Sequence, residues 1–149
     1  MSKRILAEYK LLMSKKLPGI LEVDMDEKEN RLWKLKISGP TGSPYESGTF
    51  VVKYEMEEDH PFKKPKITFE TQIYHPNVNL EDMTVCITVL DKWKPATNAV
   101  NVFEELIRVL EKPEFEHPAN VSMVEEETTG VFAKKAKEWT IKHAGGKKN

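Results

Sequence analysis

The chain has 149 residues, of which 39% are hydrophobic and 32% charged, and its formal net charge is -1. This length suits one domain with one core, and the near-neutral charge gives no reason to expect nucleic acid or a membrane as partner. The amino-terminal segment is interrupted by charged residues, unlike a signal peptide, and the single cysteine, Cys86, cannot form an internal disulfide. We therefore expect a protein of the cytoplasm, with the nucleus as a second location.

The first expected element is a helix that starts from a cap at Ser2 and runs to about Lys16, where Pro18 and Gly19 end it. Apolar residues recur at helical spacing along one face: Ile5, Leu6, Tyr9, Leu12 and Met13. The other face is basic, and on composition alone it is an ordinary solvated surface.

From residue 21 to residue 69 the apolar period changes to two, which is typical of strands with one buried face. Short strands are expected at 21–25, 33–37, 50–56 and 67–69, joined by turn-rich loops. Because no helical segment separates one strand from the next, an antiparallel meander is favoured over a parallel sheet.

The helical period returns at about Asn98, with an apolar stripe that ends near Pro113. Two shorter helices are expected at 120–128 and 129–143, separated near Gly130, and the tail 145–149 is expected to fray. The chain is thus predicted to be a single domain spanning 1–149, of the broad α/β kind and more narrowly α+β, with a sheet backed by helices.

The segment 70–98 has no clear period, although it contains Cys86, Trp93 and two prolines. An ordered loop of this length is usually functional. Neither a metal site nor a phosphate-binding loop is indicated, because ligand spacings and glycine-rich turns are missing. A lone cysteine is more often inert than reactive. If Cys86 is a nucleophile, thioester exchange suits it best, because that reaction needs no strong base and His75 is constrained beside Pro76.

Several motifs together make the chain resemble the ubiquitin-conjugating enzymes, from Lys3 to about His143. They are Trp33 before Gly39-Pro40, Ser43-Pro44-Tyr45 with Gly48, Pro61-Phe62-Lys63 with Pro65-Lys66, Tyr74-His75-Pro76-Asn77, Cys86, and Trp93 with Pro95-Ala96. Each motif is weak alone, whereas their order and spacing are specific. The resemblance implies a four-stranded antiparallel sheet with an N-terminal helix, a long central helix and two C-terminal helices.

The resemblance also implies roles for residues around the cysteine. Cys86 would accept the carboxyl terminus of ubiquitin as a thioester from the activating enzyme, which consumes the ATP, so that no cofactor or metal is needed. Asn77 would stabilise the oxyanion or brace the loop, and the two roles can coexist. His75 would be structural.

Departures from the family pattern indicate a subgroup. Many relatives carry acids two positions after the cysteine and before the proline of the following helix, where this chain has Thr88 and His117. Acids there help a lysine lose its proton, so their loss favours transfer to a cysteine. Glu104 and Arg108 on the long helix would also disfavour a folded-back ubiquitin. The pattern resembles enzymes that serve HECT and RING-between-RING ligases; ordinary lysine reactivity is the alternative.

The family's partner surfaces carry over to specific residues. The ligase-binding face would contain Arg4, Pro61, Phe62, Lys94, Pro95 and Ala96. Lys3 and Arg4 match the basic helix surface that meets the activating enzyme. The expected partners are therefore ubiquitin, its activating enzyme and a ligase, and the protein is expected to be a monomer.

Two other functions remain open at this stage. The chain could conjugate a different ubiquitin-like modifier, which would use the same thiol chemistry. It could instead be a non-catalytic ubiquitin-binding scaffold, but such variants lack the cysteine that this chain retains.

Overall fold

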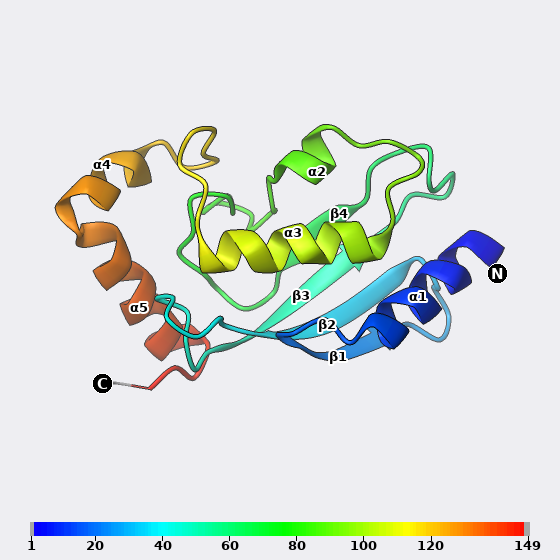
Figure 1. Cartoon of the computed structure of the whole chain (residues 1–149), viewed down its shortest axis with the longest axis horizontal. Helices are drawn as coiled ribbons and strands as arrows, with labels where there is room; N and C mark the ends of the chain where they lie inside the picture. Colours follow the sequence, from blue (N-terminus) through cyan, green and yellow to red (C-terminus); the bar gives the residue numbers. More distant parts are fainter. Residues whose placement is uncertain (1, 148–149) are drawn as a thin grey trace.

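A computed structural model describes residues 2–147 and shows a four-stranded sheet with helices packed around it (Figure 1). The strand order is β1-β2-β3-β4 and every neighbouring pair is antiparallel, so the predicted meander and the α+β class are confirmed. In chain order the elements are α1 (Lys3–Lys15), β1 (Ile20–Met25), β2 (Leu32–Ser38), β3 (Thr49–Glu55), β4 (Lys66–Phe69), α2 (Thr88–Asp91), α3 (Ala99–Glu111), α4 (Ser122–Thr129) and α5 (Val131–His143).

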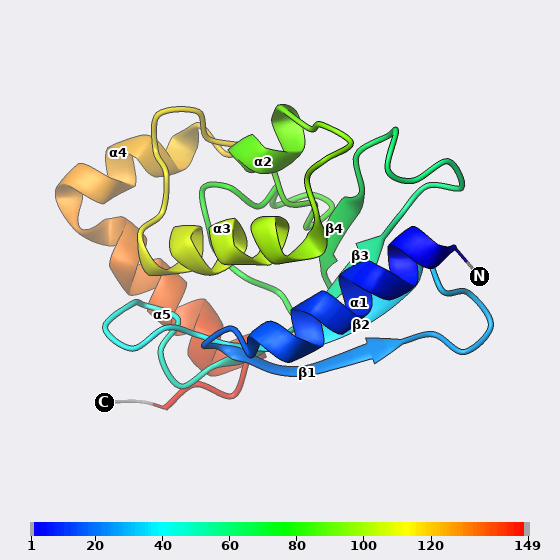
Figure 2. The ribbon, with the colours of Figure 1, turned by 45° about the vertical axis from the view of Figure 1, so that its right-hand side comes forward.

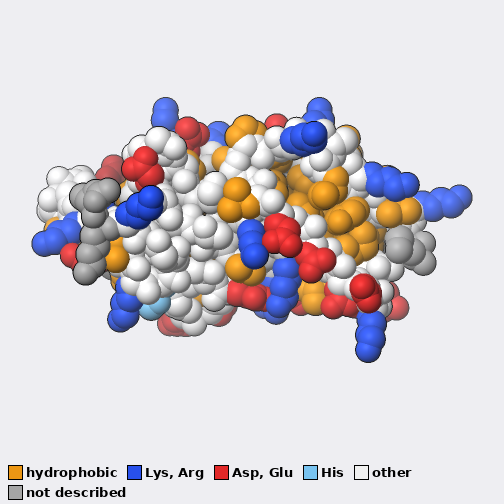
Figure 3. All heavy atoms as spheres, turned by 90° about the horizontal axis from the view of Figure 1, so that it is seen from below, with side chains coloured by type: hydrophobic (Ala, Val, Ile, Leu, Met, Phe, Trp, Pro, Cys, Tyr) orange, Lys and Arg blue, Asp and Glu red, His pale blue; other side chains and the backbone are white. Residues whose placement is uncertain are grey.

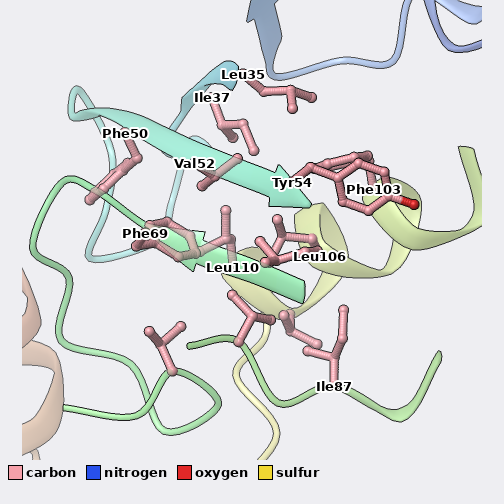
Figure 4. Close-up of a cluster of buried hydrophobic side chains, with 14 of the residues drawn as sticks. Leu35, Ile37, Phe50, Val52, Tyr54, Phe69, Ile87, Phe103, Leu106 and Leu110 are labelled. Carbon is pink, nitrogen blue, oxygen red and sulfur yellow. The ribbon is translucent and has the colours of Figure 1, made fainter. Parts of the chain in front are cut away.

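The core lies between one face of the sheet and α3 (Figure 4). Alternate residues of β2 and β3 point to the same face, and the register places them opposite one another: Trp33 with Tyr54, Leu35 with Val52, and Ile37 with Phe50. The α3 helix buries Phe103, Leu106 and Leu110 against this layer. This apolar contact fixes α3 across the sheet, which in turn fixes the side chains that α3 directs toward the loop around Cys86.

The α1 helix runs beside β1 and packs against α3 (Figure 2). Ser2 caps it as predicted, because its side chain accepts the Ile5 N–H at 3.3 Å. The inward residues are Ile5, Glu8 and Leu12. Met13, expected in the buried stripe, is 46% exposed, whereas Glu8, which was not expected there, is buried. Figure 3 shows apolar side chains at the surface toward the end of the molecule where α1 starts, beside a mixture of acidic and basic groups.

β1 differs from the expected strand in one respect. Leu21 was expected to point inward with Val23, yet it is 60% exposed. The pairing of β1 with β2 is irregular between Ile20 and Glu22, and this irregularity changes the side-chain alternation. The inward residue at this end of β1 is therefore Ile20, which packs against the core.

The two predicted C-terminal helices are present as α4 and α5, at the opposite end of the molecule from the start of α1 (Figure 1). Gly130 separates them in a left-handed conformation (φ 81°), which glycine adopts without strain. Within residues 2–147, none of the helices combines the length and the apolar character that crossing a membrane would require.

The tail was expected to fray from residue 145, but its described part makes specific hydrogen bonds. The Gly146 N–H donates to the Thr140 carbonyl at 3.0 Å, and the Lys147 N–H donates to Ser47 Oγ at 2.8 Å. Just before them, the Ala144 carbonyl accepts the Thr49 N–H at 3.0 Å. These hydrogen bonds connect residues 146 and 147 to α5 and to the loop before β3, while fraying of the tail stays a prediction. Residues 148–149 lie outside the described part of the chain.

Candidate active site

Cys86 lies in the loop between β4 and α2, at the meeting point of two surface cavities. The preceding residue, Val85, forms a single antiparallel bridge with Val78, and the Cys86 N–H donates to the Asn77 carbonyl at 2.8 Å. One cavity, of about 540 Å³, lies toward the loop that follows β3, and the other, of about 550 Å³, lies toward α3. The sulfur is partly buried and can be approached from either side.

The environment of Cys86 keeps the thiol protonated. Partial burial raises its pKa, and the negative charges of Asp91 and Asp82 raise it further, while Lys64 opposes them. A thiol of this kind is a poor nucleophile toward an unactivated amide or ester. It can exchange with an acyl group that arrives already activated as a thioester, because the leaving group is then also a thiolate.

His75 is not available as a base for this thiol. Its ring is fully buried, and burial lowers its pKa from 6.5 to about 4, so it is neutral at physiological pH. Nε2–H donates to the Val109 carbonyl at 2.7 Å, and Nδ1 accepts the Asn77 N–H at 3.0 Å. In a continuous helix the Val109 carbonyl would accept an N–H from residue 113, but Pro113 has none. His75 therefore completes the C-terminal turn of α3.

The Asn77 side chain is buried and braces the segment that follows α3. Its Nδ2 donates to the Glu114 carbonyl at 2.9 Å, and its Oδ1 accepts the Glu114 N–H at 3.0 Å. Of the two roles that the sequence left open for this residue, this geometry corresponds to bracing. The same residue holds Cys86 through its backbone carbonyl, so Asn77 connects the thiol loop with the segment 113–118.

Asn120 makes a second connection, which the sequence did not suggest. Its Nδ2 donates to the carbonyls of Val78 and His75 at 2.6 and 3.0 Å, and its Oδ1 accepts the Leu80 N–H at 3.1 Å. The Ala119 N–H also donates to the Pro76 carbonyl at 2.7 Å, so the loop that contains Asn77 is hydrogen-bonded to the segment after α3 at several points. No sequence motif marks Asn120, since its partners are backbone groups about 40 residues away.

Two residues that the sequence singled out, Thr88 and His117, do meet near Cys86. Both are exposed and both line the cavity on the α3 side. Four acidic side chains line the same cavity: Asp91, Glu105, Glu114 and Glu116. The helix α2, also unpredicted, presents Thr88 at its start and Asp91 at its end.

The residues predicted to bind a ligase lie on two loops that are joined to each other. Trp93 Nε1–H donates to the Pro61 carbonyl at 2.8 Å and so ties the loop before β4 to the loop before α3. Phe62 follows Pro61 and is 74% exposed. Lys94, Pro95 and Ala96 follow Trp93 and are exposed as well. A large apolar side chain on a braced loop is a suitable anchor for a protein partner.

Arg4 and Lys3, at the start of α1, differ in their surroundings. Lys3 is exposed, whereas Arg4 is partly buried and donates to the Thr97 carbonyl at 2.7 Å and to the Glu8 carboxylate at 2.9 Å. Arg4 therefore fastens the loop before α3 to α1, in addition to any contact that it makes with a partner.

Glu8 is the buried centre of this junction and was not recognised in the sequence. Besides Arg4, its carboxylate contacts His60 Nε2 at 2.6 Å and accepts the Ala99 N–H at 2.6 Å. Burial alone would raise the pKa of Glu8, but the hydrogen bonds from His60 and Arg4 outweigh burial and lower it. The charged carboxylate thus joins α1, the Phe62 loop and the start of α3.

Residues 4–140 match the sequence profile of the family described as ubiquitin-conjugating enzyme. The chain belongs to this family. It is 34% identical over 146 residues to the probable ubiquitin-conjugating enzyme E2 31 of Arabidopsis thaliana, with 96% of this chain and 93% of the relative covered. It is 32% identical to ubiquitin-conjugating enzyme E2-18 kDa of Drosophila melanogaster, with 96% and 95% covered.

A solved structure supports the same assignment. The E2 domain of a Toxoplasma gondii ubiquitin-conjugating enzyme superposes with a TM-score of 0.81 at 27% identity, with 95% of this chain and 97% of that one covered. The enzyme is therefore a transferase with the ubiquitin-conjugating fold, and membership of the family implies ubiquitin, an activating enzyme and ligases as partners.

Proposed function

We propose that the enzyme accepts ubiquitin on Cys86 as a thioester and passes it on preferentially to the catalytic cysteine of a ligase. The observation that supports this best is the thiol's position between two open cavities, with its neighbouring histidine neutral and already hydrogen-bonded on both nitrogens. Thioester exchange is the reaction that such a thiol can carry out without a base.

In the loading step, the Cys86 sulfur attacks the thioester carbonyl that links ubiquitin to the activating enzyme. A new C–S bond forms, the old C–S bond breaks, and the proton of Cys86 passes to the departing thiolate through solvent. In the discharge step, a ligase thiolate attacks the Cys86 thioester in the same way. Neither step needs an oxidant, a metal or a cofactor, and ATP is consumed earlier, by the activating enzyme.

The preference for a thiol acceptor is inferred from Thr88 and His117, which line the cavity beside Cys86 without supplying a carboxylate. A lysine amine, with a reference pKa of about 10.4, is almost fully protonated at neutral pH, whereas a cysteine, at about 8.5, is partly ionised. The ligase surface itself would be the braced pair of loops around Phe62 and Pro95. HECT and RING-between-RING ligases are the classes that offer a cysteine acceptor.

The test is to mix the enzyme with activating enzyme, ATP and ubiquitin, and to compare gels run with and without reductant. We expect an adduct that requires ATP and that reductant removes. In the Cys86→Ser variant the adduct should become resistant to reductant, as an oxygen ester, or disappear. An unchanged reductant-sensitive adduct in that variant would place the acceptor at another residue and refute the proposal.

The same experiment separates the alternatives. Parallel reactions with other ubiquitin-like modifiers, each with its own activating enzyme, would show whether one of them loads better than ubiquitin. If no modifier forms an adduct although the protein is folded, a scaffold function is favoured over catalysis.

A further inference from the structure

Asp91 occupies a position that no other carboxylate near the thiol shares. Among the described residues, Cys86 and Asp91 are the two that line both of the cavities that meet at the thiol. Asp91 is exposed, at the last position of α2. A nucleophile that approaches Cys86 through either cavity therefore encounters the Asp91 carboxylate at the rim.

The helix that presents Asp91 is held in place by α3. α2 has only four residues, and its N-cap, Ile87, has no side-chain oxygen to accept the first free N–H groups. Glu105 supplies that acceptor from α3, because its Oε2 accepts the Val89 N–H at 2.7 Å. Its other oxygen, Oε1, accepts Arg108 Nη2 at 3.0 Å. The Glu105 side chain is only 14% exposed, so solvent does not readily replace it.

The other acids of the α3-side cavity are less suited to meet an acceptor. Glu105 is committed to Val89 and Arg108, and Glu114 Oε1 accepts the Glu116 N–H at 2.6 Å. Glu114 and Glu116 line one cavity only. Asp91 is thus the carboxylate near the thiol that an acceptor can reach through either cavity.

We propose that Asp91 is the carboxylate that receives an amine acceptor at Cys86, and that Glu105 is the positioning residue that holds α2 so that Asp91 faces the thiol. The inference rests on the proposed thioester at Cys86. With Asp91 in this role, the enzyme would transfer ubiquitin to lysine as well as to a ligase cysteine, but more slowly. Asp91 would be a single acid in place of the two acids whose positions Thr88 and His117 occupy.

In this route the Asp91 carboxylate binds the incoming lysine ammonium by a charge-assisted hydrogen bond and orients it. A proton leaves the ammonium for solvent by way of Asp91, and the neutral nitrogen attacks the thioester carbonyl. The C–N bond forms, the C–S bond breaks and Cys86 departs as a thiolate. The attacking nitrogen releases its second proton to solvent as it becomes an amide nitrogen, and the Cys86 thiolate takes up a proton from solvent in exchange. A thiol acceptor bypasses this step, because it reaches the reactive ionised form more easily.

The experiment begins with the full chain loaded with ubiquitin, after which the remaining ATP is removed. Free lysine, free cysteine or hydroxylamine is then added, and the loss of thioester is followed. Hydroxylamine serves as an amine that is largely unprotonated at neutral pH. Asp91→Asn is compared with Asp82→Asn, a matched control that removes another negative charge near Cys86 from a residue that lines neither cavity.

We expect Asp91→Asn to slow discharge to lysine about a hundredfold, at the lower end of the range for proton transfer by a positioned side chain. Discharge to cysteine and to hydroxylamine should change less than about twofold, and Asp82→Asn should not reproduce the lysine defect. Lysine discharge that stays within about twofold, or an equal loss with all three acceptors, would overturn the role of Asp91.

Glu105 is tested in the same assay by a pair of variants. Glu105→Gln retains an oxygen for the Val89 N–H, whereas Glu105→Ala does not. The alanine variant should lose lysine discharge as Asp91→Asn does, and the glutamine variant should recover most of it. Equal rates for the two variants would refute the positioning role. Loading is measured before discharge. If neither the unmodified protein nor any variant forms the Cys86 thioester, that result counts against the proposed function and not against the role of Asp91.

Discussion

His75 makes the stability of this fold depend on pH in a calculable way. Burial lowers its pKa from 6.5 to about 4, so the folded protein binds fewer protons at this residue than the unfolded chain does between those values. The stabilising effect is fully present above the unfolded pKa of 6.5 and is lost as the pH falls through this window toward the folded value. Acid should therefore weaken the junction between the thiol loop and α3.

The magnitude follows from the two pKa values. Their difference corresponds to about 3 kcal/mol in full, and about 2 kcal/mol of it is lost between roughly pH 7.5 and roughly pH 5. The ring is completely buried, so screening by solvent does not reduce this figure. Glu8 contributes in the same direction, because its pKa is lowered as well, but its share is lost mainly below pH 4.5, the ordinary value for its carboxyl.

Urea unfolding followed by tryptophan fluorescence measures the effect. The free energy of unfolding is determined near pH 7.5 and near pH 5 for the unmodified protein and for His75→Gln. Glutamine keeps an N–H donor for the Val109 carbonyl but does not titrate, so this variant should lose about 2 kcal/mol less between the two pH values. If both proteins lose the same amount, the neutral, buried state of His75 is wrong.

Three other predictions concern binding, acceptor choice and the loop brace. Phe62→Ala should weaken ligase binding by about 2 kcal/mol while leaving thioester loading intact; Val121→Ala, at a residue that is 76% exposed, is the matched control, and an equal loss in both would refute the anchor role. The double change Thr88→Asp with His117→Asp should raise discharge to lysine and leave discharge to cysteine nearly unchanged, and equal rates with both amino acids in the unmodified protein would refute thiol preference. Asn120→Ala removes three hydrogen bonds and should destabilise the fold by about 3 kcal/mol in urea unfolding, and a loss below about 1 kcal/mol would contradict the proposed brace.

The sheet and the long helices were predictable because their signals are local. An apolar period of two specifies a strand with one buried face, and a stripe at helical spacing specifies α3, whatever the rest of the chain does. The order β1-β2-β3-β4 then follows from short connections, since consecutive strands without an intervening helix pair as hairpins.

The features that were not predicted depend on contacts between distant residues. Glu8 has the sequence context of a solvated glutamate, and only the arrival of His60 and Ala99 from elsewhere in the chain makes its burial favourable. The helix α2 has no capping residue of its own and depends on Glu105.

The site has two parts: a hydrogen-bonded frame beneath the thiol, formed by His75, Asn77 and Asn120, and an exposed rim around the thiol. The two parts should affect the choice of acceptor differently. Asn77, Asn120 and His75 make their hydrogen bonds to backbone groups, so the loop beneath Cys86 has little freedom to rearrange when an acceptor arrives. The residues at the rim, among them Thr88, Asp91 and His117, are exposed. Because the frame is common to every reaction at the thiol, discrimination between a cysteine and a lysine acceptor must come from the rim. Substitutions there should therefore change the ratio of the two discharge rates, whereas substitutions in the frame should lower both rates together with stability.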